Sequence, residues 1–224
     1  MERVIGIEDS TMNDIDSPKP KRRWYQYSLR TLLLLTLVIS VGLGLLGRKV
    51  DRLRNEQDTE KKAVAKIEEM GGWVGYDSVN RPLMDRWISK LFGFRETVVS
   101  SVDLEGAEVT AAGLACLRDF PHFDILDLRR SQITDADLKH LKELTNLYVL
   151  DLSDTQVTGT GFEHLGDLTN LEFLNLFGTQ VADTALEHLK GMTKLRLLHL
   201  NATPVTEEGV EKLQQALPHC SILY

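Results

Sequence analysis

The sequence has few of the features that identify disulfide-rich domains, metalloproteins or hydrolases. Its 224 residues include only two cysteines, Cys116 and Cys220, at opposite ends of the repeat array described below. Stacked repeats would hold them farther apart than the roughly 7 Å between Cα atoms that a disulfide tolerates, so they do not indicate a redox compartment. A nucleophile elbow, a glycine-rich phosphate loop, a His-Glu-x-x-His pair and paired Cys motifs are also missing. We therefore expect neither enzymatic activity nor a cofactor.

Positive charge is scarce in the second half of the chain. Residues 1–98 carry 17 Lys and Arg against 14 Asp and Glu, a net charge of +3. Residues 99–224 carry 9 against 19, a net charge of −10, which completes the −7 of the whole chain. Because an acidic surface repels phosphate, we expect no nucleic-acid partner.

Charge is absent from residues 31–47, TLLLLTLVISVGLGLLG. As a helix this run would be about 25 Å long, just enough to cross a bilayer core of about 30 Å when flanking side chains snorkel. Aromatic residues on its N-terminal side, Trp24, Tyr25 and Tyr27, fit an interfacial belt. We therefore predict a single-pass transmembrane helix over 29–47, preceded by a disordered, basic-ended tail over 1–28.

A cleaved signal peptide is the rival interpretation of this run, with Gly42 and Gly44 as small residues before the cut. Against it, about 30 residues precede the run and no Ala-x-Ala site follows. The positive-inside count is nearly balanced, with five Lys and Arg shortly before the run and six shortly after it. The basic residues behind the acidic tail favour a cytoplasmic N-terminus, which would place the repeats on the non-cytoplasmic side.

Residues 48–70 indicate a juxtamembrane helix that Gly71 and Gly72 end. Its apolar stripe is loose and lies among many charges, so a solvated helix is the preferred interpretation. A stalk or a short coiled coil is the alternative.

We assign residues 71–98 to a cap, because the first repeat of an array exposes an apolar face that has no neighbour. Residues 73–76 suit a short strand, and Pro82 opens a helix that ends at Phe92 before Gly93. We expect Trp87, Leu91 and Phe92 on one side of this helix.

A repeat of 24 residues organises residues 99–224. The pattern Leu-x-Leu begins at Leu126, Leu150, Leu174 and Leu198, and Val102 and Ile222 hold the same position one period before and after. This alternation predicts a short strand. A threonine then precedes apolar residues three apart, which indicates a helix, and Thr134-x-x-Asp137 resembles a capping box. Stacked units would form a parallel sheet on one side and helices on the other, stable only when several units stack.

The unit L-x-x-L-x-L-x-x-T-x-V-T-x-x-x-L-x-x-L-x-x-L-T-N resembles a leucine-rich repeat of the ribonuclease-inhibitor-like or F-box-associated type, with Thr where many repeats have Asn. The lead RRWYQYSLRTLL resembles that of bacterial membrane-anchored proteins of this class. The resemblance implies an α/β leucine-rich repeat solenoid, with a parallel sheet on the concave face and short helices on the convex face, preceded by a single transmembrane helix. No F-box is recognisable, so a ubiquitin-ligase role is not implied.

Side chains that flank the repeated leucines point outward on the concave face, where we expect another protein to bind. Adjacent strands lie about 4.8 Å apart, so stacked carboxylates would repel one another and attract a basic surface, while two phenylalanines would act as anchors. The predicted partner-binding residues are Asp103, Glu105, Asp127, Arg129, Asp151, Ser153, Phe173, Asn175, Phe177, His199 and Asn201.

Other interpretations of these outward-facing residues stay open. The sheet could be merely solvated, with Arg129 neutralising the acidic ladder, which is the stack of the Asp103, Asp127 and Asp151 carboxylates. A Ca²⁺ site would need six or more oxygen ligands, and a zinc site in the helix column of Cys116, His140, His164 and His188 would be too stretched, so we predict no metal. The runner-up function is a structural or assembly element that self-associates through the anchor and the juxtamembrane helix.

Overall fold

A computed structural model describes residues 29–78, 83–94, 97–120 and 123–224, without the side chains of 29–31 and 83–87. The predicted tail over 1–28 lies outside these residues. The chain divides into two compact units, residues 1–46 and 47–224, which are described separately.

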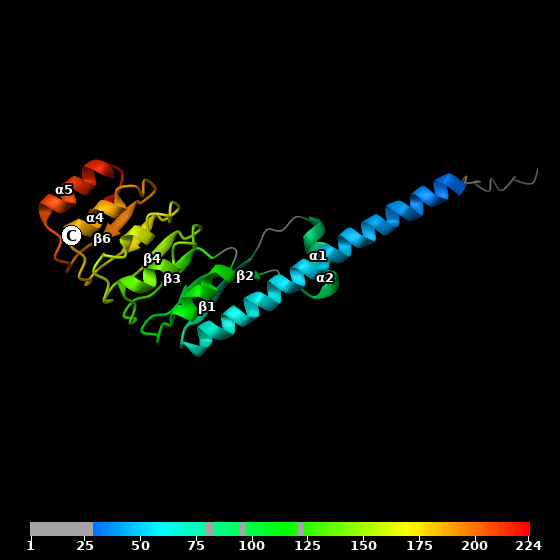
Figure 1. The fold of residues 1–224 in the computed structure, drawn as a ribbon, viewed down its shortest axis with the longest axis horizontal. Helices are drawn as coiled ribbons and strands as arrows, with labels where there is room; N and C mark the ends of the chain where they lie inside the picture. The colour runs from blue at the N-terminus through cyan, green and yellow to red at the C-terminus, as the bar shows by residue number, and fades with distance from the viewer. Residues whose placement is uncertain (1–28, 79–82, 95–96, 121–122) are drawn as a thin grey trace, which may run out of the picture. The chain divides into compact units, whose positions relative to one another are not determined.

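The second unit is built on a seven-stranded sheet whose strands follow one another in chain order (Figure 1). The strands are β1 Trp73–Ser78, β2 Thr97–Asp103, β3 Ile125–Asp127, β4 Val149–Asp151, β5 Phe173–Asn175, β6 Leu197–His199 and β7 Ser221–Leu223. From β2 to β7 the pairing is parallel, and Val102 lies in register with Leu126 and Leu150, as Leu198 does with Ile222. The predicted parallel sheet and its 24-residue register are therefore confirmed, and the terminal remnant around Ile222 forms a strand.

Strand β1 pairs antiparallel with β2, and the register shifts between Gly75 and Tyr76, opposite the extra residue Ser100 of β2. It covers the edge of the first parallel strand, so the strand predicted over 73–76 is present and extends to Ser78.

The opposite side of the repeats carries short helices, as predicted. They are α3 Ala111–Cys116, η1 Leu117–Asp119, η2 Asp135–His140, η3 Phe162–His164, α4 Asp183–Leu189 and α5 Glu207–Ala216, where η marks a 3₁₀ helix. The Asp137 carboxylate accepts from the Thr134 N–H at 2.9 Å and from its hydroxyl at 2.8 Å, which confirms the capping box. Thr158 differs, because it donates to Asp135 of the preceding repeat and does not cap η3.

The leucines of the repeat fill the core between sheet and helices. Leu126, Leu150 and Leu198 are fully buried. At the position where many repeats have asparagine, this chain has threonine, or serine in one repeat. These side chains are also buried or nearly so, and each hydroxyl donates to the carbonyl oxygen three residues earlier. These bonds are 2.6–2.7 Å long and come from Ser131, Thr155, Thr179 and Thr203. Each repeat thus satisfies a carbonyl of its own turn, as a buried polar group requires.

The turn after each strand places one residue in the left-handed region of the backbone. This residue is glycine in two repeats, but φ is +54° at Arg130, +54° at Asp154 and +60° at Ala202. A side chain at such a position costs roughly 1–2 kcal/mol, so the three non-glycine turns are strained.

Helix α1, Leu29–Glu69, joins the predicted transmembrane and juxtamembrane segments without a break. Among the described residues it is the one helix long and apolar enough to cross a membrane. Within its apolar part, Leu33 is 61% exposed and Val38 is 68% exposed. The helix ends in a Schellman motif, in which Gly71 has φ +85° and the Gly72 N–H donates to the Ile67 carbonyl.

The solvated interpretation of residues 48–70 is wrong for one face of α1. Ala63, Ile67 and Met70 belong to the core cluster of the array, and Val50 and Leu53 are buried as well. The reason is that the loose apolar stripe covers the open end of the first repeat, which would otherwise be exposed. This part of α1 therefore acts with β1 as a cap.

Helix α2, Leu83–Phe92, ends before Gly93, whose φ is +71°. Pro82 and the Trp87 side chain lie outside the described part. Of the residues expected on one side of this helix, Leu91 is 76% exposed and Phe92 is 45% exposed, whereas Ile88 and Ser89 are buried.

Candidate functional site: the concave face

The concave face of the sheet is formed by the side chains that alternate with the buried leucines. Asp103, Asp127, Asp151, Asn175 and His199 face one another across neighbouring strands in a single row. A second row, one residue before each core leucine, contains Ser101, Ile125, Val149, Phe173 and Leu197. The structure thus brings the predicted columns together as continuous rows.

The polar row has a structural role that its sequence did not reveal. The side-chain oxygen in each of four repeats accepts a hydrogen bond from the backbone N–H two residues later. The donors are Glu105, Arg129, Ser153 and Phe177, at 2.9, 3.0, 2.9 and 3.1 Å. Asp and Asn side chains commonly form such local hydrogen bonds in turns. One oxygen of each of these side chains therefore fixes the turn after the strand.

Arg129 crosses the acidic end of this row. Its guanidinium contacts Asp127 at 2.8 Å and Glu105 at 3.1 Å. The hydrogen bond from Arg129 to Asp127 and the charges of Asp127, Glu105 and Asp151 raise the pKa of Arg129. Arg130 adds a second cation, 2.8 Å from Glu105. Much of the ladder's negative charge is therefore already paired within the chain.

Asp151 is held by its own neighbours. The Ser153 hydroxyl donates to one carboxylate oxygen at 2.6 Å, and the Asn175 amide donates to the other at 2.9 Å. Ser153 is only 5% exposed, so the expectation that its side chain points outward is wrong: the short side chain turns back to Asp151. Asn175 separates Asp151 from His199 in the row. Ser153, His199 and Asp151 therefore do not form a catalytic Ser-His-Asp triad.

A shallow hollow of about 210 Å³ lies on the concave face over β4, β5 and β6. Its outward-facing lining consists of Val149, Asp151, Phe173, Asn175, Leu197 and His199. Two aromatic pairs stand beside it: the ring centroids of Tyr148 and Phe173 are 5.6 Å apart, and those of Phe177 and His199 are 5.5 Å apart. This half of the face offers apolar and aromatic contact area, whereas the half over β2 and β3 offers charge.

Three residues of this surface were missing from the predicted set. Val149 and Leu197 stand in the same row as Phe173; alternation in the sequence already places them in one apolar stripe, but only Phe173 of that stripe was counted among the binding residues. Tyr148, which is 39% exposed, could not be placed by alternation because β4 begins only at the next residue. Asn201, which was predicted, is half-buried, and its carbonyl accepts from the Gly178 N–H.

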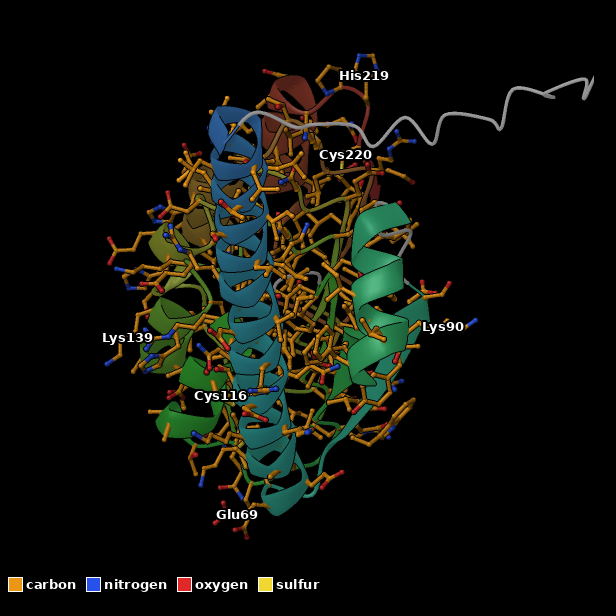
Figure 2. All side chains as sticks on the ribbon, turned by 90° about the vertical axis from the view of Figure 1, so that its right-hand side faces the viewer. Glu69, Lys90, Cys116, Lys139, His219 and Cys220 are labelled. Atoms are coloured by element: carbon orange, nitrogen blue, oxygen red, sulfur yellow. The ribbon has the colours of Figure 1, made fainter. Side chains whose placement is uncertain are left out.

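The helix column does not assemble a metal site. Among the residues that the structure describes, no three His, Cys, Asp or Glu side chains form a group able to hold a metal ion. The Cys116 thiol donates to the Gly113 carbonyl at 2.9 Å, and burial and Asp119 raise its pKa. Burial also raises the pKa of Cys220 to about 11. Both cysteines, labelled in Figure 2, are free and disfavour the thiolate form.

Comparison with solved structures finds partial likenesses. A leucine-rich-repeat protein of Leptospira interrogans is 24% identical with a TM-score of 0.43, over 49% of this chain and 27% of that one. An internalin, InlF, of Listeria monocytogenes is 18% identical with a TM-score of 0.34, over 55% and 46%. The ectodomain of an Arabidopsis thaliana membrane receptor kinase is 16% identical with a TM-score of 0.40, over 67% and 19%. The chain thus spans less than half the length of each of these three.

No curated protein matches the sequence. Residues 121–181 match the family model described as leucine rich repeat. Together with the parallel sheet and the short helices, this match identifies the fold of the array as leucine-rich-repeat-like.

Proposed function

We propose that this chain is a membrane-anchored, non-enzymatic protein that binds another protein through the concave face of its repeats. Leucine-rich-repeat proteins generally mediate protein–protein interaction. The observation that carries the proposal is the hollow over β4 to β6, where Val149, Phe173 and Leu197 present apolar side chains beside two aromatic pairs.

The partner's chemistry follows from the two halves of the face. Aromatic side chains are common anchors of an interface and bind in desolvated pockets, so we expect an apolar or aromatic side chain of the partner in the hollow. Asp103, Glu105 and Asp127 lie over β2 and β3. Arg129 and Arg130 neutralise only part of their charge, so a basic flank of the partner would face them. A segment with an apolar residue followed by Lys or Arg fits both halves.

Membrane anchoring is supported by the apolar part of α1. Its leucines are exposed all around the helix, as Leu33, Leu34 and Leu35 illustrate, and only 6% of the most apolar stretch is buried. A helix that is apolar on every side needs an apolar solvent or a protein partner. We propose a single pass through the membrane over residues 31–47, with the N-terminus in the cytoplasm and the array on the other side.

Self-association through the juxtamembrane helix has less support. Val50, Leu53 and Ile67, the apolar stripe that a coiled coil would use, are already buried in the same unit as the array.

The binding proposal is tested by capturing partners from solubilised membranes with the full chain. Phe173→Ala removes an anchor, and Val149→Asp places a charge in the hollow. His188→Asp, on the exposed side of α4, is the matched control. The concave variants should lose the protein that the wild type and the control retain, while all keep the same circular dichroism spectrum. Retention by all variants would contradict the proposal.

Charge reversal at Asp127 or Asp151, by substitution with lysine, tests the binding proposal less well than the substitutions at Phe173 and Val149. Each carboxylate accepts from the backbone N–H two residues later, so a lysine there would break a turn as well as change the charge. Asn keeps the acceptor oxygen and removes only the charge. Asp127→Asn should therefore weaken binding of a basic partner, and weaken it less at high salt, without altering the fold.

A further inference from the structure

The last turn of α2 exposes bulky apolar side chains that the array does not cover. Leu91 is 76% exposed and Phe92 is 45% exposed, although Ile88 and Ser89 on the same helix are buried. Phe92 stacks on Phe94, with ring centroids 6.2 Å apart. Leu91, Phe92 and Phe94 therefore form a small apolar tip, which we call the α2 tip.

Chain length allows the α2 tip to reach the point at which the apolar segment ends. Leu53, Thr97 and Val98 line one groove, so the start of β2 and α1 around Leu53 border the same hollow. Leu53 follows Gly47 by six residues, which is about 9 Å along a helix. Phe92 precedes Thr97 by five residues, and a chain of that length spans at most about 17 Å. The tip can therefore reach the plane through Gly47.

Basic residues are adjacent in sequence to both the apolar segment and the α2 tip. Arg48, Lys49, Arg52 and Arg54 follow the apolar segment, and Lys90 precedes the α2 tip. Figure 2 shows the Lys90 side chain pointing outward from α2. Apolar side chains flanked by Lys and Arg are typical of helices that lie in a membrane interface, and basic residues beside a membrane segment favour anionic headgroups.

We propose that the α2 tip inserts into the headgroup layer of the membrane that anchors α1. This inference rests on the proposed anchor. The occupant of the exposed apolar surface is then lipid, and α2 forms a second attachment point that limits rotation of the array about the axis of α1. The position of the concave face relative to the membrane would thereby be fixed.

The test uses the full chain in vesicles of phosphatidylcholine and phosphatidylglycerol, with a nitroxide label at one introduced cysteine. Cys116→Ala and Cys220→Ala remove the native thiols. Leu91→Cys reports on the tip, Leu37→Cys on the anchor, and Leu223→Cys on the far end of the array. Both Leu91 and Leu223 are exposed, so labelling them should not disturb the fold.

Collision of the label with oxygen, which dissolves in lipid, is compared with collision with a water-soluble nickel chelate. The expected result is that labels at 91 and 37 collide mainly with oxygen and the label at 223 mainly with nickel. If 91 behaves like 223 while 37 stays lipid-like, the tip proposal is overturned and the anchor stands. If 37 also behaves like 223, the anchor itself fails. Spin–spin broadening at 91 would mean contact with a second copy and would equally overturn lipid insertion.

Discussion

Asp135 links two successive repeats, and its removal should destabilise the array more than any other single carboxylate on the helix side. One carboxylate oxygen accepts from the N–H groups of Gly159 and Gly161 at 2.9 and 3.0 Å, and the other accepts from the N–H and the hydroxyl of Thr158. Both glycines are buried, so their donors would be left without a partner. At about 1–3 kcal/mol per unsatisfied donor, and with some rescue by water, Asp135→Ala should lower the free energy of unfolding by roughly 2–4 kcal/mol.

Asp183 provides the matched control, because it holds the same position two repeats later. Within the described part of the chain it accepts only from the exposed Thr206, through its N–H at 2.8 Å and its hydroxyl at 2.6 Å. Asp183→Ala should therefore cost about 0.5–1.5 kcal/mol. Urea denaturation of the full chain in detergent micelles, followed by circular dichroism, measures both. Equal losses in the two variants would refute the account of how the repeats are joined.

The hydrogen bonds to Asp135 also predict that the stability of the array depends on pH. Burial alone would raise the pKa of Asp135, but the hydrogen bonds from Thr158, Gly161 and Gly159 outweigh it and lower the pKa. A lowered folded-state pKa means that the stabilisation is complete above the unfolded pKa of about 3.9 and is lost as the pH falls toward the folded value. The difference in stability between the wild type and Asp135→Ala should be constant from neutral pH down to about 5 and shrink below about 4. A difference that does not shrink in acid would contradict this assignment.

Three further predictions concern the core, the turns and the anchor. Leu150→Ala should cost about 2–5 kcal/mol in urea denaturation, because the side chain is fully buried in the middle of the array. Ala202→Gly should raise the melting temperature, since relief of left-handed strain of about 1–2 kcal/mol exceeds the entropy cost of glycine of about 0.5–1 kcal/mol; a lower melting temperature would count against the strain. Leu37→Arg with Ile39→Arg should release the chain from membranes on alkaline washing, because each charge near the bilayer centre costs about 2.5–3.5 kcal/mol; continued retention would argue against a membrane span.

The sequence predicted the parallel sheet because a period of 24 residues leaves one register. Val102, Leu126 and Leu150 could be aligned by counting, and burial of their side chains explains why the pattern holds. The outward rows followed from alternation. What counting could not show is where an outward side chain bends: Ser153 turns back to Asp151, and Asp103, Asp127, Asp151 and Asn175 each accept from the backbone of their own turn.

The elements outside the repeat were harder to place. The stripe that includes Leu53 and Ile67 was visible in the sequence, but nothing local shows which surface covers it, because the covering residues lie tens of positions away. The surroundings of α2 could not be predicted for a related reason. Leu91 and Phe92 have the composition of a packing face, and composition does not distinguish contact with protein from contact with lipid or another chain.

Binding at the hollow is tested most directly by a photoreactive phenylalanine analogue in the full chain in its native membrane. One variant carries it at Phe173, in the hollow, and a second at His188, on the exposed side of α4. Illumination should produce one discrete adduct from position 173, which Leu197→Asp in the same chain abolishes, and none from position 188. Equal adducts from both positions, or an adduct at 173 that survives Leu197→Asp, would contradict binding through the concave face.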